Sequence, residues 1–169
     1  MTIDPATMTW MLSDPECDGD SFDIWRFTLG EMYSFNKNDK FIIKKHMKGT
    51  SQNITFTTIT GTPVINNEIA LLLREEEDRG LIQLIPAIIE NEVIDYYILN
   101  VINCIDCMEK KEDRKYLYLE KMSGNSIFRI KNDETILIVS DIFKNKIEHY
   151  KLHGVKFHDI LSLGFFTVV

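Results

Sequence analysis

The sequence predicts an α+β fold in which a mostly antiparallel β-sheet packs with two principal helices. Short runs of β-branched and aromatic residues alternate with Gly, Pro, Asn and Asp, a pattern that is typical of strands joined by turns. Two longer segments, residues 66–79 and 141–153, instead repeat apolar residues at helical spacing behind an N-capping residue. A chain of 169 residues suits one domain, so residues 1–169 are predicted to form a single unit.

The first 61 residues are predicted to be a β-rich part of this domain. Residues 1–21 combine prolines with closely spaced acidic residues, which predicts a solvated, loop-rich arm. Strands are expected at residues 22–28, 41–43 and 54–60, where β-branched and aromatic residues gather. Gly61 then ends the last of these strands.

The first helix is predicted from its cap, its apolar stripe and its end. Asn66 suits the N-cap, and Ile69 and Leu73 recur at helical spacing on the side that faces the core. Gly80 suits the end of the helix, because glycine readily adopts the left-handed conformation that closes helices. A further strand is expected at residues 81–85, before a proline.

Residues 93–107 are the longest apolar run and are predicted to be a strand that is covered on both faces. The run contains Asn100 and Asn103, whose amides would cost about 1–3 kcal/mol each if they were buried without hydrogen-bond partners. We interpret both asparagines as structural groups that fix a sheet edge or a neighbouring loop.

The C-terminal part is predicted to contain three strands followed by the second helix. The strands are expected at residues 115–120, 126–130 and 135–139. Ser140 suits the N-cap of the helix, Phe143 and Ile147 form its buried stripe, and Gly154 is predicted to end it. Both helical segments place a glycine 14 residues after the cap and lie between apolar runs, which suggests two related strand–helix–strand halves. Coincidence is the alternative, because this unit is common.

Composition and charge exclude several classes of function. The formal net charge of −7 disfavours a nucleic-acid-binding protein and allows a basic protein partner. No membrane-spanning run and no basic, apolar secretion signal are seen, so the expected location is the cytoplasm. Three cysteines are too few and too scattered for a disulfide framework, which agrees with a reducing compartment.

The motifs that carry chemistry point away from an enzyme and from a cofactor. The chain has no nucleophile elbow, phosphate-binding loop or dinucleotide fingerprint. Cys104 and Cys107 form a C-x-x-C pair, which we interpret as inert core thiols, with a metal or redox site as the alternative. His149 and His153 stand four residues apart on the second helix, but the helix dipole alone favours histidines there.

The run Tyr96–Asp106 resembles the motif "yyvlNvlnvvDa", and Ser126–Ile130 resembles the strand motif "iFrl". Both motifs are those of a bacterial immunity protein family that is found beside polymorphic toxins. The segment from Ile138 to Phe157 resembles its "ivSdefk…GvrF" ending. The resemblance covers about residues 62–158, whereas residues 1–61 do not match. In place of a second aspartate of the family pattern, this sequence has Glu109.

The resemblance implies a small cytoplasmic, non-catalytic protein that binds a cognate toxin and occludes it. Toxins of this kind often act on nucleic acids and present basic clefts, so acidic side chains are the candidate contacts. The candidate toxin-binding residues are Asp14, Asp18, Asp20, Glu75, Glu76, Glu77, Asp78 and Asp106. The alternative functions are a small-ligand-binding or regulatory module and a metal or thiol site at Cys104 and Cys107.

Overall fold

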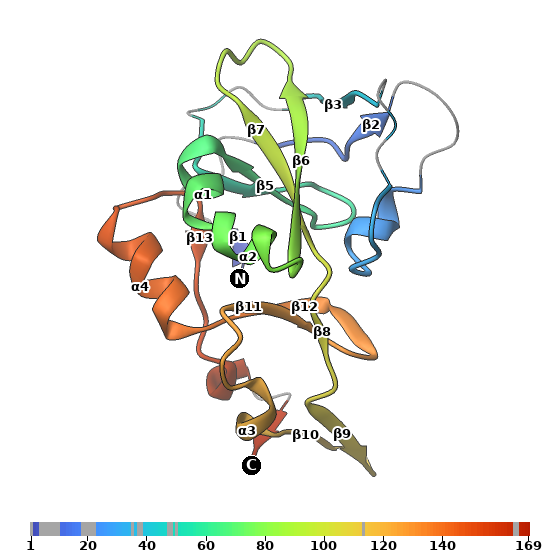
Figure 1. The fold of residues 1–169 in the computed structure, drawn as a ribbon, viewed down its shortest axis with the longest axis vertical. Coiled ribbons are helices and arrows are strands. Elements are labelled where there is room, and N and C mark those ends of the chain that lie inside the picture. The colour runs from blue at the N-terminus through green and yellow to red at the C-terminus, as the bar shows by residue number, and fades with distance from the viewer. Residues whose placement is uncertain are drawn as a thin grey trace.

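The computed structural model confirms the predicted α+β class. It describes residues 2–3, 11–17, 23–34, 36, 39–46, 49, 51–112, 114–163 and 166–169. The described chain builds one six-stranded sheet, two three-stranded sheets and a two-stranded pair, together with short helices (Figure 1). Most strand pairs are antiparallel, which agrees with the prediction.

The six-stranded sheet forms the upper part of the molecule in Figure 1. In spatial order its strands are β2 (Glu16–Cys17), β3 (Phe41–Ile43), β6 (Ile82–Ile89), β7 (Tyr96–Val101), β5 (Pro63–Asn66) and β4 (Ile54–Phe56). β6 and β7 form a long antiparallel hairpin at its centre, and most of their buried residues are β-branched or aromatic. Of the described strands in this sheet, only β3 and β6 pair in parallel.

The smaller sheets are built from the C-terminal half of the chain. One contains β12 (Asp133–Val139), β11 (Ile127–Ile130) and β8 (Cys104–Ile105). The other contains β14 (Phe166–Val168), β10 (Arg114–Leu117) and β9 (Met108–Lys111). The two-stranded pair joins β1 (Thr2–Ile3) to β13 (Val155–Lys156), so the beginning of the chain lies beside its last quarter.

The first predicted helix is two short helices, α1 (Asn67–Leu72) and α2 (Arg74–Asp78). The predicted cap is confirmed, because the Asn66 side chain accepts a hydrogen bond from the N–H of Ile69 (3.2 Å). Gly80 closes α2 in the left-handed conformation, and the N–H of Leu81 reaches back to the carbonyl of Glu76 (2.9 Å). The break at Leu73 follows a tight turn in which its N–H bonds the carbonyl three residues back.

The second predicted helix is α4 (Asp141–His149), which ends four residues earlier than predicted. Ser140 caps it as expected and accepts from the N–H of Phe143 (3.3 Å). The prediction that Gly154 ends this helix is wrong. Lys151 adopts the left-handed conformation after the helix (φ 53°), and the N–H of Leu152 bonds the carbonyl of Ile147 (3.2 Å).

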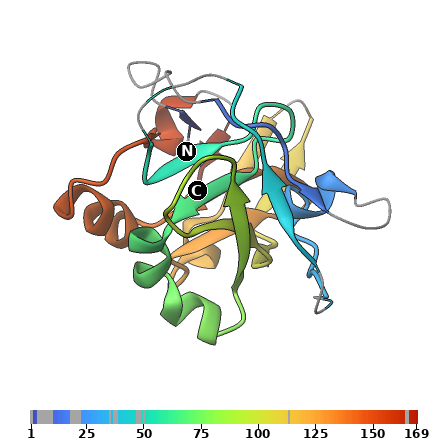
Figure 2. The same cartoon turned by 90° about the horizontal axis from the view of Figure 1, so that it is seen from above.

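Both helical segments pack their stripes into one core. Ile69 and Leu73 from the first segment and Phe143 and Ile147 from the second are buried in the same cluster. Seen from above, α1 and α2 (green) and α4 (orange-red) lie on the same side of the molecule (Figure 2). The shared core explains why the two segments have the same apolar pattern.

Two other sequence-based expectations have clear outcomes. The strand predicted at residues 22–28 is wrong: Ile24–Phe27 is a 3-10 helix, because the Asp23 carboxylate accepts from the N–H of Trp25 and starts a turn. The structural interpretation of the two asparagines is confirmed. Asn100 donates to Gln83 (2.9 Å) and to the carbonyl of Glu31 (2.8 Å), and Asn103 donates to side-chain and backbone oxygens near β11.

Candidate functional site

The acidic cluster of α2 divides into two structural and two solvent-facing carboxylates. Glu76 is 5% exposed and accepts a hydrogen bond from the hydroxyl of Ser126 (2.7 Å), immediately before β11. Glu77 pairs with Arg74 (2.5 Å) and accepts from the N–H of Leu84 (3.2 Å). Glu75 and Asp78 are exposed, so these two remain accessible to a partner.

Asp14 lies in a buried network of threonine hydroxyls beneath the turn that follows β4. Its carboxylate is 9% exposed and accepts from the N–H groups of Ile59 (3.1 Å) and Thr60 (3.0 Å) and from the Thr60 hydroxyl. Burial alone raises the pKa of Asp14, but the hydrogen bonds from Thr60, Thr57 and Ile59 outweigh it and hold the pKa below its usual range. In the folded protein this carboxylate anchors the turn at residues 57–62.

The Asp14 network predicts a specific acid dependence of stability. The folded pKa is depressed, so its stabilising contribution is present above the unfolded pKa of about 3.9 and is lost as the pH falls through the lower folded value. We expect Asp14→Asn to lower the free energy of unfolding by about 1–3 kcal/mol at pH 7. Urea unfolding of both proteins between pH 7 and pH 2.5 measures this difference, which should shrink below about pH 4. A constant difference across this range would contradict the assignment.

The remaining acidic candidates are Asp106, Asp18 and Asp20, and the structure does not place them on α2 or in the Asp14 network. Asp106 is exposed in the short connection between β8 and β9. Asp18 and Asp20 lie outside the described residues. Among the described candidates, Glu75, Asp78 and Asp106 therefore present carboxylates to solvent.

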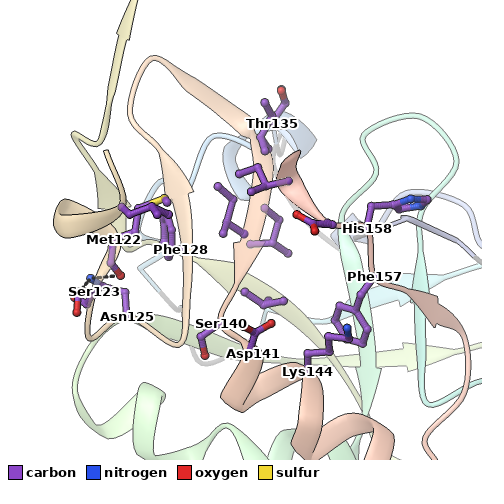
Figure 3. A pocket seen from close by; sticks show the side chains of 17 residues that line it. Met122, Ser123, Asn125, Phe128, Thr135, Ser140, Asp141, Lys144, Phe157 and His158 are labelled. Carbon is purple, nitrogen blue, oxygen red and sulfur yellow. Dashed lines mark hydrogen bonds between the residues drawn. The ribbon is translucent and has the colours of Figure 1, made fainter. Parts of the chain in front are cut away.

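The described part of the chain is hollowed by a groove of about 770 Å³ that runs along β12 (Figure 3). One wall is formed by residues 135–139 of β12, and another by residues 157–160. Side chains from residues 119–128, including Phe128, line a third side. No motif in the sequence marks this groove. Its only local signal is the run Ile136–Val139, which is apolar on both faces of its strand.

A second hollow of about 440 Å³ lies against the same strand. Thr135 and Leu137 line both hollows, while Trp25 and Ile59 line the second one and are exposed. Large apolar side chains at a hollowed surface are common in protein–protein interfaces. The surroundings of β12 therefore combine two hollows with exposed apolar side chains.

The two cysteines of the C-x-x-C pair lie in different surroundings. The prediction of a core thiol is confirmed for Cys107, which is buried in the core cluster beneath β10 and β11. It is wrong for Cys104, which lies in the short strand β8 and is exposed. Burial raises the pKa of both thiols, which favours the neutral, unreactive form. No group of three or more His, Cys, Asp or Glu side chains in the described ranges is arranged to hold a metal ion.

Comparisons with known proteins give one match, to part of the chain. None of the helices formed by the described residues has the length and apolar character needed to span a membrane. No curated protein matches the chain. The family model that does match is that of an immunity protein family (Imm11), and it covers residues 110–162, from β9 to η3 (Ile160–Leu163). Over these residues the predicted resemblance to an immunity protein family is confirmed, and this part of the chain is similar to Imm11.

Proposed function

We propose that this protein is an immunity protein that binds a cognate bacterial toxin in the cytoplasm and neutralises it without catalysis. The observation that carries the proposal is the match of residues 110–162 to an immunity protein family. The matched segment contributes to the groove along β12 and includes α4. An inhibitor of this kind needs a stable, shaped surface rather than a reaction centre.

The proposal predicts that a toxin domain is encoded beside this gene, and that domain is the partner with which it is tested. Cells that express the active domain should survive when this protein is co-expressed, and a catalytically inactivated domain should co-purify with it at a fixed stoichiometry. An unrelated toxin domain is the control for specificity. Survival without a complex, or a complex that leaves the toxin fully active, would contradict neutralisation by binding.

We further propose that exposed carboxylates steer the toxin towards this protein. Glu75 and Asp78 face solvent on α2, and Asp106 faces solvent after β8. The net charge of −7 gives the whole molecule a field that attracts a basic partner. Asp14 and Glu76 contribute to this field but are committed to hydrogen bonds within the fold.

Reversing the exposed charges of α2 is expected to slow association with the toxin. The double variant Glu75→Lys/Asp78→Lys should lower the association rate constant by about tenfold at low salt, and by less at high salt, because screening shortens the range of the field. Stopped-flow or surface-based kinetics at several salt concentrations measures the effect.

A matched control keeps the total charge change and moves its position. Glu90 and Asp95 are both exposed around the β6–β7 connection, so Glu90→Lys/Asp95→Lys alters the net charge by the same amount. Equal effects of the two double variants would assign steering to the overall charge. An unchanged association rate in the α2 variant would remove α2 from the binding surface.

A further inference from the structure

Among the residues that the structure describes, β12 lies at the edge of its sheet and its backbone is paired on one side. In the described chain its sheet has the order β12–β11–β8, so β11 is its sheet neighbour (Figure 1). The N–H of Ser140 bonds the carbonyl of Ser126 (2.8 Å), and the same register continues to Phe128 opposite Ile138. Because bonded and non-bonded pairs alternate in antiparallel strands, Leu137 and Val139 direct their N–H and C=O groups towards the open edge.

The open edge of β12 faces the groove rather than a flat, solvent-exposed surface. Residues 135–139 form one wall and residues 157–160 stand across from them (Figure 3). Ile136 and Ile138 are half-buried, and Leu119, which also lines the groove, is 54% exposed. An extended segment placed here would gain main-chain hydrogen bonds from β12 and apolar contacts for alternate side chains.

The charges of the groove favour a basic occupant. Asp141 and Asp159 line it and are exposed. Lys144 and His158 also line it, and the ammonium of Lys144 lies 4.0 Å from the carboxylate of Glu148 on the next turn of α4. A lysine or arginine in the occupant can pair with the exposed Asp141, and the net charge of −7 attracts a basic partner to the molecule as a whole.

From this geometry we propose that the edge of β12 receives an extended segment of the cognate toxin as an added strand. The segment carries apolar side chains at alternate positions and a basic side chain towards Asp141. Strand addition supplies affinity through the backbone, and the groove supplies specificity through the side chains. This inference rests on the proposed function, because the toxin is the partner that supplies the strand.

Hydrogen exchange on the complex with the inactivated neighbouring toxin domain tests the proposal. The amide protons of Leu137 and Val139 should exchange at least about tenfold more slowly in the complex than in the free protein, because each gains an acceptor. The amide of Ile138, which faces β11, serves as an internal reference. Complex formation is followed separately by size-exclusion chromatography.

The outcomes separate this inference from the proposed function. A complex without added protection at Leu137 and Val139 overturns strand addition and leaves the immunity function standing. The absence of any complex overturns both. Protection in the free protein that grows with its concentration would assign the edge to a second copy of this chain and would also overturn the proposal.

A pair of surface variants gives a second readout. Leu119→Arg places a cation and extra volume in the groove and should weaken toxin binding at least about tenfold. Val93 is fully exposed in the β6–β7 connection, at the opposite end of the molecule in Figure 1, so Val93→Arg should leave binding unchanged. Equal affinity of both variants and the parent protein would contradict docking along the groove.

Discussion

Gly154→Ala is expected to lower the free energy of unfolding by at least about 4 kcal/mol, which is enough to prevent stable folding of many domains. Gly154 is buried and has a φ of 104°, a backbone conformation that residues other than glycine rarely adopt. A Cβ atom at this position would stand 1.9 Å from the carbonyl oxygen of Ile54 and 2.9 Å from the Cβ of Gln52. The first of these contacts is with backbone in β4, so rotation of a side chain cannot relieve it.

Equilibrium urea unfolding measures this loss, and Gly61→Ala is the matched control. Gly61 also has a left-handed φ (63°), but a Cβ there meets no atom within 4 Å. Its substitution should cost about 1–2 kcal/mol, the conformational penalty alone. Similar losses for the two variants would contradict the close approach of residue 154 to β4.

The same contact bears on domain organisation. Around Gly154 the chain is tied to β4, since His153 accepts from the N–H of Ile54 (3.1 Å) and donates to the side chain of Asn53 (2.9 Å). These bonds join His153, which lies in the segment that matches the immunity family, to residues about a hundred positions earlier in the chain. We therefore propose that residues 1–169 unfold in a single cooperative transition, as the sequence-based prediction of one domain requires.

The features predicted correctly from the sequence are those determined by nearby residues. Asn66 and Ser140 cap their helices because a short polar side chain reaches an N–H three residues ahead. Gly80 closes α2 for an equally local reason. The cost of burying an unpaired amide predicts that the side-chain N–H groups of Asn100 and Asn103 have hydrogen-bond partners. It does not predict which residues those partners are.

The features that were missed depend on residues distant in the sequence. Gly154 follows a helix at a distance that suggests a helix-ending glycine. The close approach of β4 is instead what requires a glycine at this position. Glu76 belongs to an acidic run that suggests a solvated surface. Its carboxylate is instead buried and accepts a hydrogen bond from the hydroxyl of Ser126, fifty residues later. Asp14 is similar, because the turn at Thr60 supplies its hydrogen bonds. Charge alone therefore predicts the acidic character of the surface better than it predicts which carboxylates are accessible.

The groove could not be predicted for a related reason. It depends on how β12, α3 (Leu119–Met122) and the segment before η3 are placed relative to one another. Sequence patterns give the direction of side chains within a strand, but they do not state whether the edge of that strand is covered. Edge position emerges only from the order of strands in the sheet.

Arg129 holds three segments of the protein together through its buried guanidinium. Its residue is 2% exposed, and its nitrogens donate to the carbonyls of Val101 (3.1 Å), Glu134 (2.7 Å) and Phe27 (3.1 Å). Desolvation lowers its pKa to about 10, so the side chain remains charged at neutral pH. Arg129 of β11 thus bonds three other segments, namely β7, β12 and η2 (Ile24–Phe27).

Two opposing effects decide what removal of this side chain does. Hydrogen bonds from a charged donor contribute about 1.5–3 kcal/mol each, and three of them are lost together. Removing the buried charge regains part of its desolvation penalty, which amounts to several kcal/mol. Because the carbonyls of Phe27, Val101 and Glu134 would each lose this donor, we expect the loss to dominate.

Arg129→Met is therefore expected to lower the free energy of unfolding by about 3 kcal/mol, as measured by urea unfolding at pH 7. Arg129→Lys keeps the positive charge but replaces the planar fork by one compact ammonium, which cannot address three separated carbonyls in the same way. It should remain destabilised by at least about 2 kcal/mol. Full stability of the lysine variant would show that charge alone holds these segments. Full stability of the methionine variant would show that the three carbonyls do not need this donor, and that the convergence of β7, β11 and η2 is maintained by apolar packing.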